Sequence, residues 1–411
     1  MLRSMFSAIS GLRGNQIYMD VIGNNIANIN TTAFKSARAS FSTTLAQTVR
    51  PASAPQLDRG GINPVQVGLG TTLASIDTIF IQGDLKSTSR LTDMAIEGEG
   101  FFILSDGQRQ VYTRDGAFDI GLDGSLLSPA TGFKVQGWMV DPVTGTLDTT
   151  SGLAPLTIPI NQQSPAQATT ATSFTGNLDS RVAVGATVTT NMEVYDSLGG
   201  THVITVTFTK AGANSWDWAI SENDTSIDGL AGSGTITFDT SGQVTAGGTG
   251  AITIDYSAAS GLADGAVDID FTSIGQVAQN SEVTLSARDG ATAGDFVTFT
   301  VDKTGLLTAV YSNGVNELIG QIALARFANP GGLLQAGNNH YEMSPNSGVP
   351  VISTPGNNGL GSVNSGFLEA AHVDLAQQFT DMIIASRGFQ ANSRVVTTAD
   401  EMLQELVNLK R

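Results

Sequence analysis

The sequence contains no cysteine, and this absence removes several chemistries from consideration. Without a thiol the chain can form no disulfide, no thiolate metal site and no cysteine nucleophile. The three histidines, His202, His340 and His372, lie far apart and lack the H-x-x-x-H or HExxH spacing that places two zinc ligands on one helix face. No G-x-S-x-G elbow and no P-loop occurs either. We therefore expect no enzyme activity, no bound metal and no cofactor.

Basic residues are also scarce, with 20 Lys and Arg against 37 Asp and Glu and a net charge of −17. A nucleic-acid partner needs a basic face, so neither nucleic acid nor an anionic lipid surface is expected to bind. No stretch approaches the roughly 18 consecutive apolar residues of a membrane span, and no membrane insertion is expected. The apolar residues at the N-terminus are interrupted by Ser4, Ser7 and Ser10. Such a segment makes a poor signal peptide, and we expect any export to proceed without its cleavage.

Glycine is abundant, at 47 of 411 residues. Together with many Thr, Ser, Asn and Asp residues, this favours short strands joined by tight turns. The pairs Asp106-Gly107, Asp115-Gly116 and Asp123-Gly124 recur about every nine residues and are typical of hairpin turns. This spacing predicts an antiparallel meander or sandwich.

The two ends of the chain differ from this β pattern. Apolar residues occur at every seventh position near the C-terminus, and in steps of three and four near the N-terminus, with breaks at Gln16 and Gly23. Such a repeat turns one apolar helix face toward a partner helix, and a lone helix is marginal in water. The ends are expected to pair with each other or with other copies, as in a filament subunit. The predicted assembly interface comprises Leu2, Met5, Ile9, Leu12, Met19, Ile26, Leu368, Leu375, Phe379, Met382, Phe389, Val396 and Leu403.

The predicted fold is mainly β with α-helical termini, in which nested antiparallel sandwich-like or barrel-like β domains are flanked by amphipathic helices that pair as a coiled coil. The segment 149–290 carries 14 acidic and 3 basic residues, a net of −11, which indicates a solvated outer face. The predicted parts are a terminal helical assembly domain (1–30 and 367–411), an extended connector without regular structure (31–72), an inner β domain (73–148 and 291–366) and an outer inserted β domain (149–290).

Two local patterns leave alternatives open. Trp216 and Trp218 alternate along a predicted strand and so share one face, which favours packing within the sheet, with a sugar-stacking platform as the alternative. Asp119, Gly121 and Asp123 suggest a calcium loop, but the later Glu that such a loop needs is missing. A two-residue hairpin turn explains Asp123-Gly124 better.

Both ends resemble a known family. The segment NNIANINTTAFK (24–35) resembles the N-terminal signature of bacterial flagellar rod and hook proteins, in which glycine usually replaces Ala33, a departure that argues against a left-handed turn there. The segments 368–383 and 387–394 resemble the C-terminal signature, and 401–411 is similar to hook proteins in particular. The stretches 98–137 and 329–348 resemble the shared β domain, and 194–199 with 216–218 resembles the additional hook domain. The signature residues are Asn25, Ala27, Asn28, Thr31, Phe34, Lys35, Arg387, Phe389, Gln390 and Asn392.

The resemblance implies a structural subunit that polymerises into a flexible helical tube, a universal joint carrying torque from rod to filament outside the cell. It also implies export through the flagellar type III apparatus, and rod, hook-cap and hook–filament junction proteins as partners. One alternative is a distal rod protein of the same family, although rod proteins resemble this chain without the 149–290 insertion. The others are a β-rich surface adhesin or carbohydrate-binding protein that uses Trp216 and Trp218, and a secreted hydrolase.

Overall fold

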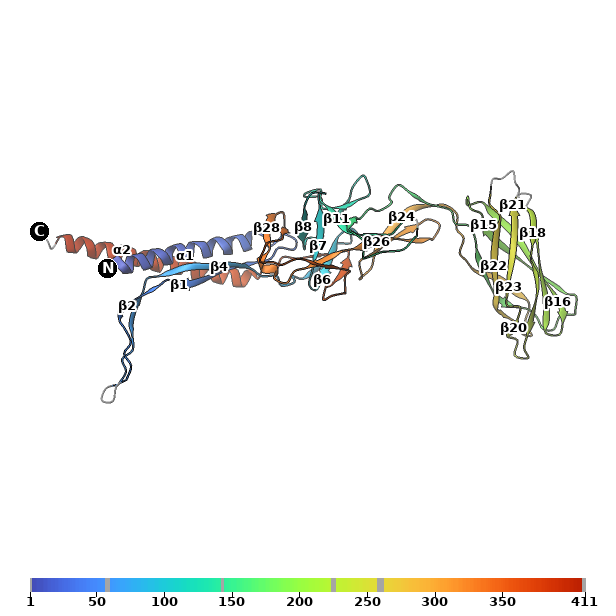
Figure 1. The fold of residues 1–411 in the computed structure, drawn as a ribbon, viewed down its shortest axis with the longest axis horizontal. Helices are drawn as coiled ribbons and strands as arrows, with labels where there is room; N and C mark the ends of the chain where they lie inside the picture. The colour runs from blue at the N-terminus through green and yellow to red at the C-terminus, as the bar shows by residue number, and fades with distance from the viewer. Residues whose placement is uncertain (1, 56–59, 142–143, 223–226, 257–261, 409–411) are drawn as a thin grey trace. The chain divides into compact units, whose positions relative to one another are not determined.

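The computed structural model describes residues 2–408 except 56–59, 142–143, 223–226 and 257–261 (Figure 1). The chain divides into two compact units. The first comprises Met1–Ile158, Phe299–Thr308 and Leu318–Arg411, and the second comprises Pro159–Thr298 and Ala309–Glu317. The first unit carries both helices, α1 (Leu2–Ala27) and α2 (Leu375–Asn408), and strands make up most of the rest. The predicted fold class, mainly β with a helix at each end, is confirmed.

The C-terminal helix begins later than the sequence pattern predicted. Phe367–Glu369 forms strand β32, which pairs antiparallel with β5 (Leu85–Ser87). Leu368 therefore lies on a strand, and its expected place on a helix face is wrong. The helix starts after Asp374, whose carboxylate accepts the backbone N–H groups of Ala376 and Gln377 at 2.9 and 3.2 Å. This is the usual way in which a side chain caps the first turn of a helix.

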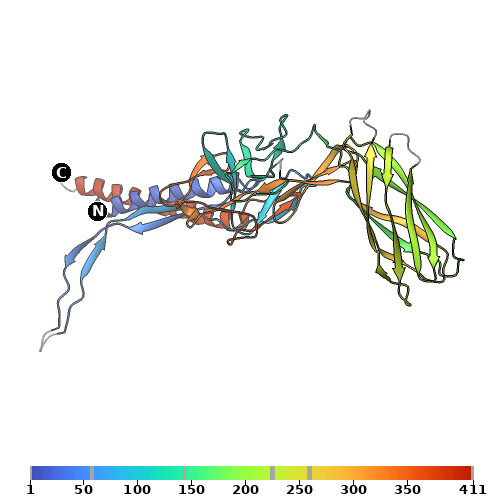
Figure 2. The same ribbon diagram turned by 45° about the vertical axis from the view of Figure 1, so that its right-hand side comes forward.

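The segment 31–72, expected to lack regular structure, forms two antiparallel pairs. Strand β1 (Ala37–Thr43) pairs with β4 (Thr71–Thr78), and β2 (Ala46–Arg50) pairs with β3 (Val65–Gly68). The prolines that suggested an irregular connector, Pro51, Pro55 and Pro64, all lie between β2 and β3. Proline cannot donate a ladder hydrogen bond, so these residues limit the strands without preventing them. In Figure 2 the β2–β3 hairpin extends away from the helix pair.

Antiparallel strands form the rest of the first unit. Strand β7 (Phe101–Ser105) pairs with β8 (Gln110–Thr113) through the Asp106-Gly107 turn, and with β11 (Lys134–Met139) and β27 (Leu324–Arg326). Aromatic rings fill the core: the centroid of Phe101 lies 5.8 Å from that of Phe327 and 5.9 Å from that of Tyr341. The remaining strands are β6 (Met94–Glu97), β9 (Asp119–Ile120), β10 (Leu126–Leu127), β12 (Ala154–Pro155), β26 (Asn316–Ile322), β28 (Leu334–Gly337), β29 (His340–Glu342), β30 (Val351–Ser353) and β31 (Ser362–Ser365), with a short 3-10 helix at Pro330–Gly332.

The second unit is a sandwich of two five-stranded sheets, ordered β18-β21-β22-β14-β23 and β15-β16-β17-β19-β20. Side chains of both sheets meet in one core, where the rings of Phe208 and Trp218 lie 5.5 and 5.3 Å from that of Phe271. The strands of these two sheets are β14 (Ala171–Asn177), β15 (Thr187–Tyr195), β16 (Thr201–Gly212), β17 (Ser215–Glu222), β18 (Ile227–Ala231), β19 (Ser233–Phe238), β20 (Val244–Ala246), β21 (Thr249–Tyr256), β22 (Gly265–Gly275) and β23 (Glu282–Arg288). Strands β13 (Gln163–Ser164), β24 (Gly294–Val301) and β25 (Leu306–Tyr311) belong to neither sheet, and the chain passes from one unit to the other within β24 and within β25.

The limits of the second unit differ from those of the predicted insertion, 149–290. Residues before Pro159 stay with the first unit because β12 pairs with β11 there. Residues beyond 290 join the second unit because β24 pairs with β13, at Asp295 with Gln163 and Gly294 with Ser164. Long-range strand pairing of this kind leaves no local signal in the sequence.

Candidate assembly interface

The two terminal helices contact each other, as the sequence predicted, and they run antiparallel (Figure 1). Near the end of α1, the Asn25 amide donates to Gln378 Oε1 at the start of α2, at 3.0 Å. Further back along α1, Asn15 lies against Gly388 and Gly11 lies against Asn392. As the residue number decreases along α1, the number of the facing residue in α2 increases, so the two helices run antiparallel.

Small and polar residues form the centre of this contact. In α2 the residues on the inner side are Gln378, Ala385, Asn392 and Ala399, which we call the contact stripe; Ala385 and Ala399 are buried and the other two half-buried. A Cβ at Gly11 would lie 2.7 Å from the Asn392 amide nitrogen, and one at Gly388 would lie 3.0 Å from Asn15. Glycine at these two positions therefore lets the helix backbones approach closely.

The predicted heptad residues lie beside this stripe. Met382, Val396 and Leu403 of α2 are half-buried, whereas Leu375, Phe379 and Phe389 are exposed. On α1, half-buried positions are Met5, Ile9, Leu12, Met19 and Ile26, and the Leu2 side chain lies outside the described residues. A coiled coil uses two positions per heptad. The sequence pattern identified the position of Leu375, Met382, Phe389, Val396 and Leu403. It missed the contact stripe, which lies three residues after each of the first four, because the side chains of the stripe are small or polar.

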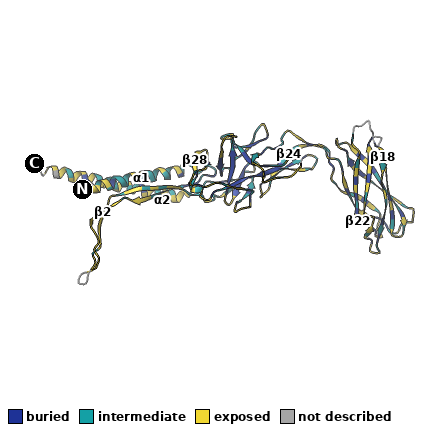
Figure 3. Cartoon of the chain, in the orientation of Figure 1, coloured by how far each residue is buried: buried dark blue, intermediate teal, exposed yellow. Residues whose placement is uncertain are grey.

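One side of α2 exposes large apolar side chains to solvent. Phe379, Ile383 and Ile384 are 51%, 62% and 60% exposed, and we call these three the outer apolar patch. Val395 and Met402 are also exposed further along the helix, as is Phe6 on α1. In Figure 3 the helices and the β2–β3 hairpin are coloured largely as exposed or intermediate, in contrast to the buried interiors of the β sheets. The first unit thus leaves much of its helical surface uncovered.

The N-terminal signature residues hold the end of α1 in place. Asn25 is buried; its amide donates to Ala37 O at 2.8 Å and its oxygen accepts Ala37 N–H at 2.9 Å. Asn28 donates to Asn24 O at 3.0 Å and accepts the Thr31 hydroxyl at 3.1 Å, which closes the turn after the helix. These contacts are within the chain and set where the connector leaves α1.

Ala33 adopts the left-handed conformation that its departure from glycine argued against. Its φ is +55° and it is buried, and its N–H donates to Glu369 O at 2.8 Å. A left-handed alanine costs about 1–2 kcal/mol. The hydrogen bond to Glu369 joins this turn to strand β32 and so stabilises the left-handed conformation of Ala33.

Lys35, another signature residue, belongs to a buried charge cluster with Glu369 and Arg114. Lys35 Nζ lies 2.5 Å from Glu369 Oε1, and Arg114 Nε lies 3.7 Å from Glu369 Oε2. Burial lowers the pKa of Lys35, although the charge of Glu369 opposes this shift. Burial likewise lowers the pKa of Arg114 against the charge of Glu369. Sequence reasoning missed Arg114 and Glu369 as partners of Lys35, because no spacing rule links three such distant positions.

The other C-terminal signature residues differ in their surroundings. Arg387 and Gln390 are exposed, Phe389 is 38% exposed, and Asn392 lies opposite Gly11. On the N-terminal side Ala27 is exposed and Phe34 is half-buried. The signatures therefore combine residues with clear contacts inside the chain and residues that face solvent.

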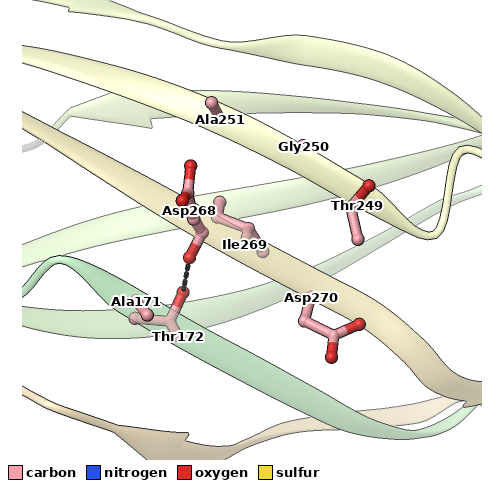
Figure 4. A pocket seen from close by; sticks show the side chains of 8 residues that line it. All are labelled: Ala171, Thr172, Thr249, Gly250, Ala251, Asp268, Ile269 and Asp270. Atoms are coloured by element: carbon pink, nitrogen blue, oxygen red, sulfur yellow. Dashed lines mark hydrogen bonds between the residues drawn. The ribbon is translucent and has the colours of Figure 1, made fainter.

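The alternatives based on the second unit find little support. Trp216 and Trp218 are 0% and 3% exposed, so they pack in the core and offer no platform for a sugar. An open depression of about 520 Å³ lies over β14, β21 and β22 (Figure 4). It presents Asp268 and Asp270, and hydrogen bonds from Thr272 lower the pKa of Asp270. No histidine, lysine or arginine is among the lining residues, so the depression lacks a partner for acid–base chemistry.

The described residues offer neither a metal site nor a membrane-spanning helix. Among the described residues, no three His, Asp or Glu side chains form a group that could hold a metal ion. In the suggested calcium loop, Asp123 instead accepts the Ser125 hydroxyl at 2.6 Å and pairs with Lys134 at 2.6 Å. Neither helix, over the part of the chain that is described, is long and apolar enough to cross a bilayer.

Four family models match consecutive parts of the chain. They describe a flagella basal body rod protein (residues 5–35), the flagellar hook protein FlgE/F/G D1 domain (95–176), the flagellar basal body protein FlaE D2 domain (161–291) and the flagellar basal body rod FlgEFG protein C-terminal region (364–409). The first includes the N-terminal signature at 24–35, and the last includes the C-terminal signature segments 368–383 and 387–394.

Whole-chain relatives agree with these models. The chain is 39% identical to the flagellar hook protein FlgE of Treponema pallidum, with 100% of both chains covered, and 32% identical to that of Salmonella typhimurium, with 99% of this chain and 100% of that protein covered. It is also 30% identical to the flagellar basal-body rod protein FlgG of Bacillus subtilis, with both chains fully covered. The 149–290 segment therefore does not by itself separate hook from rod proteins, and the higher identity favours the hook proteins.

A solved structure shows the same fold. The Helicobacter pylori flagellar hook protein FlgE2 matches 69% of this chain and 100% of its own with a TM-score of 0.54, at 15% identity. The matching models account for both helical ends and both β regions, and the relatives extend over the full length. The chain therefore belongs to the flagellar hook protein family and has the function of a structural subunit of the bacterial flagellar hook.

Proposed function

We propose that the chain polymerises into a helical tube by burying the exposed apolar sides of its terminal helices against other copies. The observation that carries this proposal is the outer apolar patch of Phe379, Ile383 and Ile384, each more than half exposed. Soluble monomers rarely expose contiguous large apolar groups, and such patches mark interaction sites. The proposed assembly interface adds the exposed Leu375 and Phe389, with the half-buried heptad residues of both helices at its edge.

The energetics suit a polymer. Full burial of one large apolar side chain contributes about 1.5–3 kcal/mol, so three partly exposed ones contribute roughly 3–6 kcal/mol to each contact. A contact between different surfaces of two copies propagates as an open helix when its rotation does not close into a ring. The gain recurs for each added subunit, which makes growth cooperative.

The β2–β3 hairpin is a second surface that other copies cover in this proposal. Every residue of β2 and of β3 is exposed, including Val49, Val65 and Val67. A two-stranded hairpin is marginally stable by itself in water. Contacts with neighbouring subunits would supply the stability that the hairpin lacks within one chain.

The parts of the chain take different roles in the proposed tube. The terminal helices line the tube, and the β strands of the first unit form an inner layer. The second compact unit forms the outer domain, with the boundaries given above instead of the predicted 149–290. Outer domains that slide over one another let the tube bend while it carries torque from rod to filament. The rod, the hook cap and the junction proteins are the further partners, and the flagellar type III apparatus exports the subunit.

Export without cleavage of the N-terminus is part of the same proposal. Ala8 is buried and Met5 and Ile9 are half-buried on α1, so these residues belong to the folded helix. Mass spectrometry of subunits from assembled hooks should find the chain starting at Met1 or Leu2. Loss of 15 or more residues would contradict this part.

Electron microscopy of the purified chain under polymerising conditions tests the main proposal. Tubes are expected. Monomers that bind polysaccharide would favour the adhesin alternative, and monomers with hydrolytic turnover would favour an enzyme. Complementation of a hook-deficient strain and of a rod-deficient strain distinguishes a hook subunit from a distal rod subunit.

A further inference from the structure

Three charged side chains from distant parts of the sequence meet in the interior of the first unit. Lys35 is the last residue of the N-terminal signature, Arg114 follows β8, and Glu369 ends β32. Their side chains are 1%, 6% and 0% exposed. Lys35 Nζ also donates to Ile81 O at 2.7 Å, and the Arg114 guanidinium donates to Gly98 O at 2.7 and 2.5 Å.

This charge cluster is a poor source of stability. It holds two cations and one anion, and Glu369 Oε2 has no hydrogen-bond partner. Buried ion pairs lose hydration that their mutual attraction often fails to restore, and apolar replacements of the whole group are frequently neutral or stabilising. Removing one member is different, because it leaves the others charged and unpaired. The attested benefit of such groups is that they specify one register.

Glu369 lies where register matters. Its carboxylate accepts the Gly83 N–H at 2.8 Å, and β32 pairs Glu369 with Leu85. The following residues run beside the N-terminal signature, since the His372 N–H donates to Phe34 O at 3.1 Å. Helix α2 begins at Leu375, so the position of β32 determines where α2 meets α1.

The helix pair specifies its own register weakly. In the contact stripe only the Asn25–Gln378 hydrogen bond and the Gly11–Asn392 approach depend on the register, whereas the small side chains of Ala385 and Ala399 add no such contact. A slip of two residues in β32 would move α2 by about 6.6 Å, close to one helical turn of about 5.4 Å. A slip of one residue would turn Glu369 to the opposite face of the strand. Either slip leaves Lys35 and Arg114 buried without their carboxylate.

We infer that Lys35, Arg114 and Glu369 are positioning residues that lock the register of the C-terminal helix against the N-terminal helix. The lock decides which side chains of α2 face outward, and so which apolar surface another copy meets. It concerns pairing inside one chain, and it holds whether or not the outer apolar patch is the polymer contact.

Cysteine pairs can report the register directly, because the chain has no cysteine of its own. A Cβ at Gly388 would lie 3.0–3.2 Å from the Asn15 side-chain atoms, so Asn15→Cys with Gly388→Cys suits a disulfide in the native register. Asn15→Cys with Ile384→Cys, and Asn15→Cys with Asn392→Cys, report a displacement of one turn in either direction. Each pair is made in the otherwise unchanged full-length chain and in one carrying Lys35→Met, Arg114→Met and Glu369→Leu.

The unchanged chain should cross-link at least tenfold faster through the native pair than through either displaced pair. In the apolar triple variant this preference should fall below about threefold, while the melting temperature stays equal or rises. A triple variant that keeps the tenfold preference would refute the lock. A triple variant with a clearly lower melting temperature would show that the cluster is a stabilising group instead.

A second variant keeps the test decisive if the triple variant folds poorly. Glu369→Gln preserves the shape of the side chain and removes its charge, so the melting temperature should fall because two buried cations lose their anion. Adding Lys35→Met, which removes one of those cations, should restore part of the loss. An unchanged melting temperature for Glu369→Gln, or no rescue by Lys35→Met, would overturn the inference.

Discussion

Replacement of Ile383 by aspartate tests the assembly surface most directly. Ile383 is 62% exposed at the centre of the outer apolar patch, so the substitution removes little packing within the chain. In a polymer contact, Ile383→Asp loses about 1–2 kcal/mol of stabilisation from apolar burial. The new carboxylate is desolvated without a partner, which costs about 1–3 kcal/mol more. Since about 1.4 kcal/mol changes an association constant tenfold, the critical concentration should rise roughly 30-fold to several thousand-fold.

The assay is sedimentation of polymer against subunit concentration, with electron microscopy of the pellet. Gln390→Asp is the matched control, because it introduces the same side chain two turns further along the same side of α2, at an exposed and already polar position. The control should polymerise near the unmodified concentration. Both variants should keep the melting temperature of the free subunit. If Ile383→Asp polymerises at the unmodified critical concentration, the outer apolar patch is not a subunit contact.

Three further outcomes follow from particular contacts. Ala33→Gly should raise the melting temperature of the first unit by a degree or two, because glycine relieves the φ of +55°, and an unchanged or lower value would mean that alanine is not strained there. Gly11→Ala should speed amide hydrogen exchange in the helix pair, because its added Cβ would lie 2.7 Å from the Asn392 amide. Gly23→Ala is the control: nothing lies within 4 Å of its added Cβ, so the higher helix propensity of alanine should slow exchange slightly. Equal effects of the two substitutions would contradict the close approach at Gly11. In the second unit, burial raises the pKa of Asp196, but hydrogen bonds from His202 and from the Gly200 and Leu198 N–H groups outweigh this effect and lower the pKa overall. The ionised Asp196 carboxylate should therefore stabilise the folded state above about pH 4, and this stabilisation should be lost as the pH falls further. Urea titrations from pH 6 to pH 2.5 should therefore show a smaller acid-induced loss for Asp196→Asn than for the unmodified chain, and an equal loss would refute this role.

The sequence predicted the structural features that depend on residues close together in the chain. The seven-residue repeat predicted a helix at each end and their contact, because period and face follow from helix geometry alone. The Asp106-Gly107 pair predicted the turn between β7 and β8, which is a loop of residues 106–109 in which Gly107 adopts a positive φ of 89°. The alternation of Trp216 and Trp218 predicted that both share the buried face of a strand, and the two signatures indicated the family.

Tertiary structure decided what depends on partners far away in the chain. Leu368 continues the heptad spacing, yet it lies on a strand because β5 pairs with that segment. The contact stripe escaped notice because Gly11 and Asn392 fit each other only after two helices meet, and hydrophobicity says nothing about such a fit. Glu369 and Arg114 look like ordinary surface charges in the sequence. Only the fold buries them beside Lys35, because burial and charge pairing depend on the positions of three segments at once.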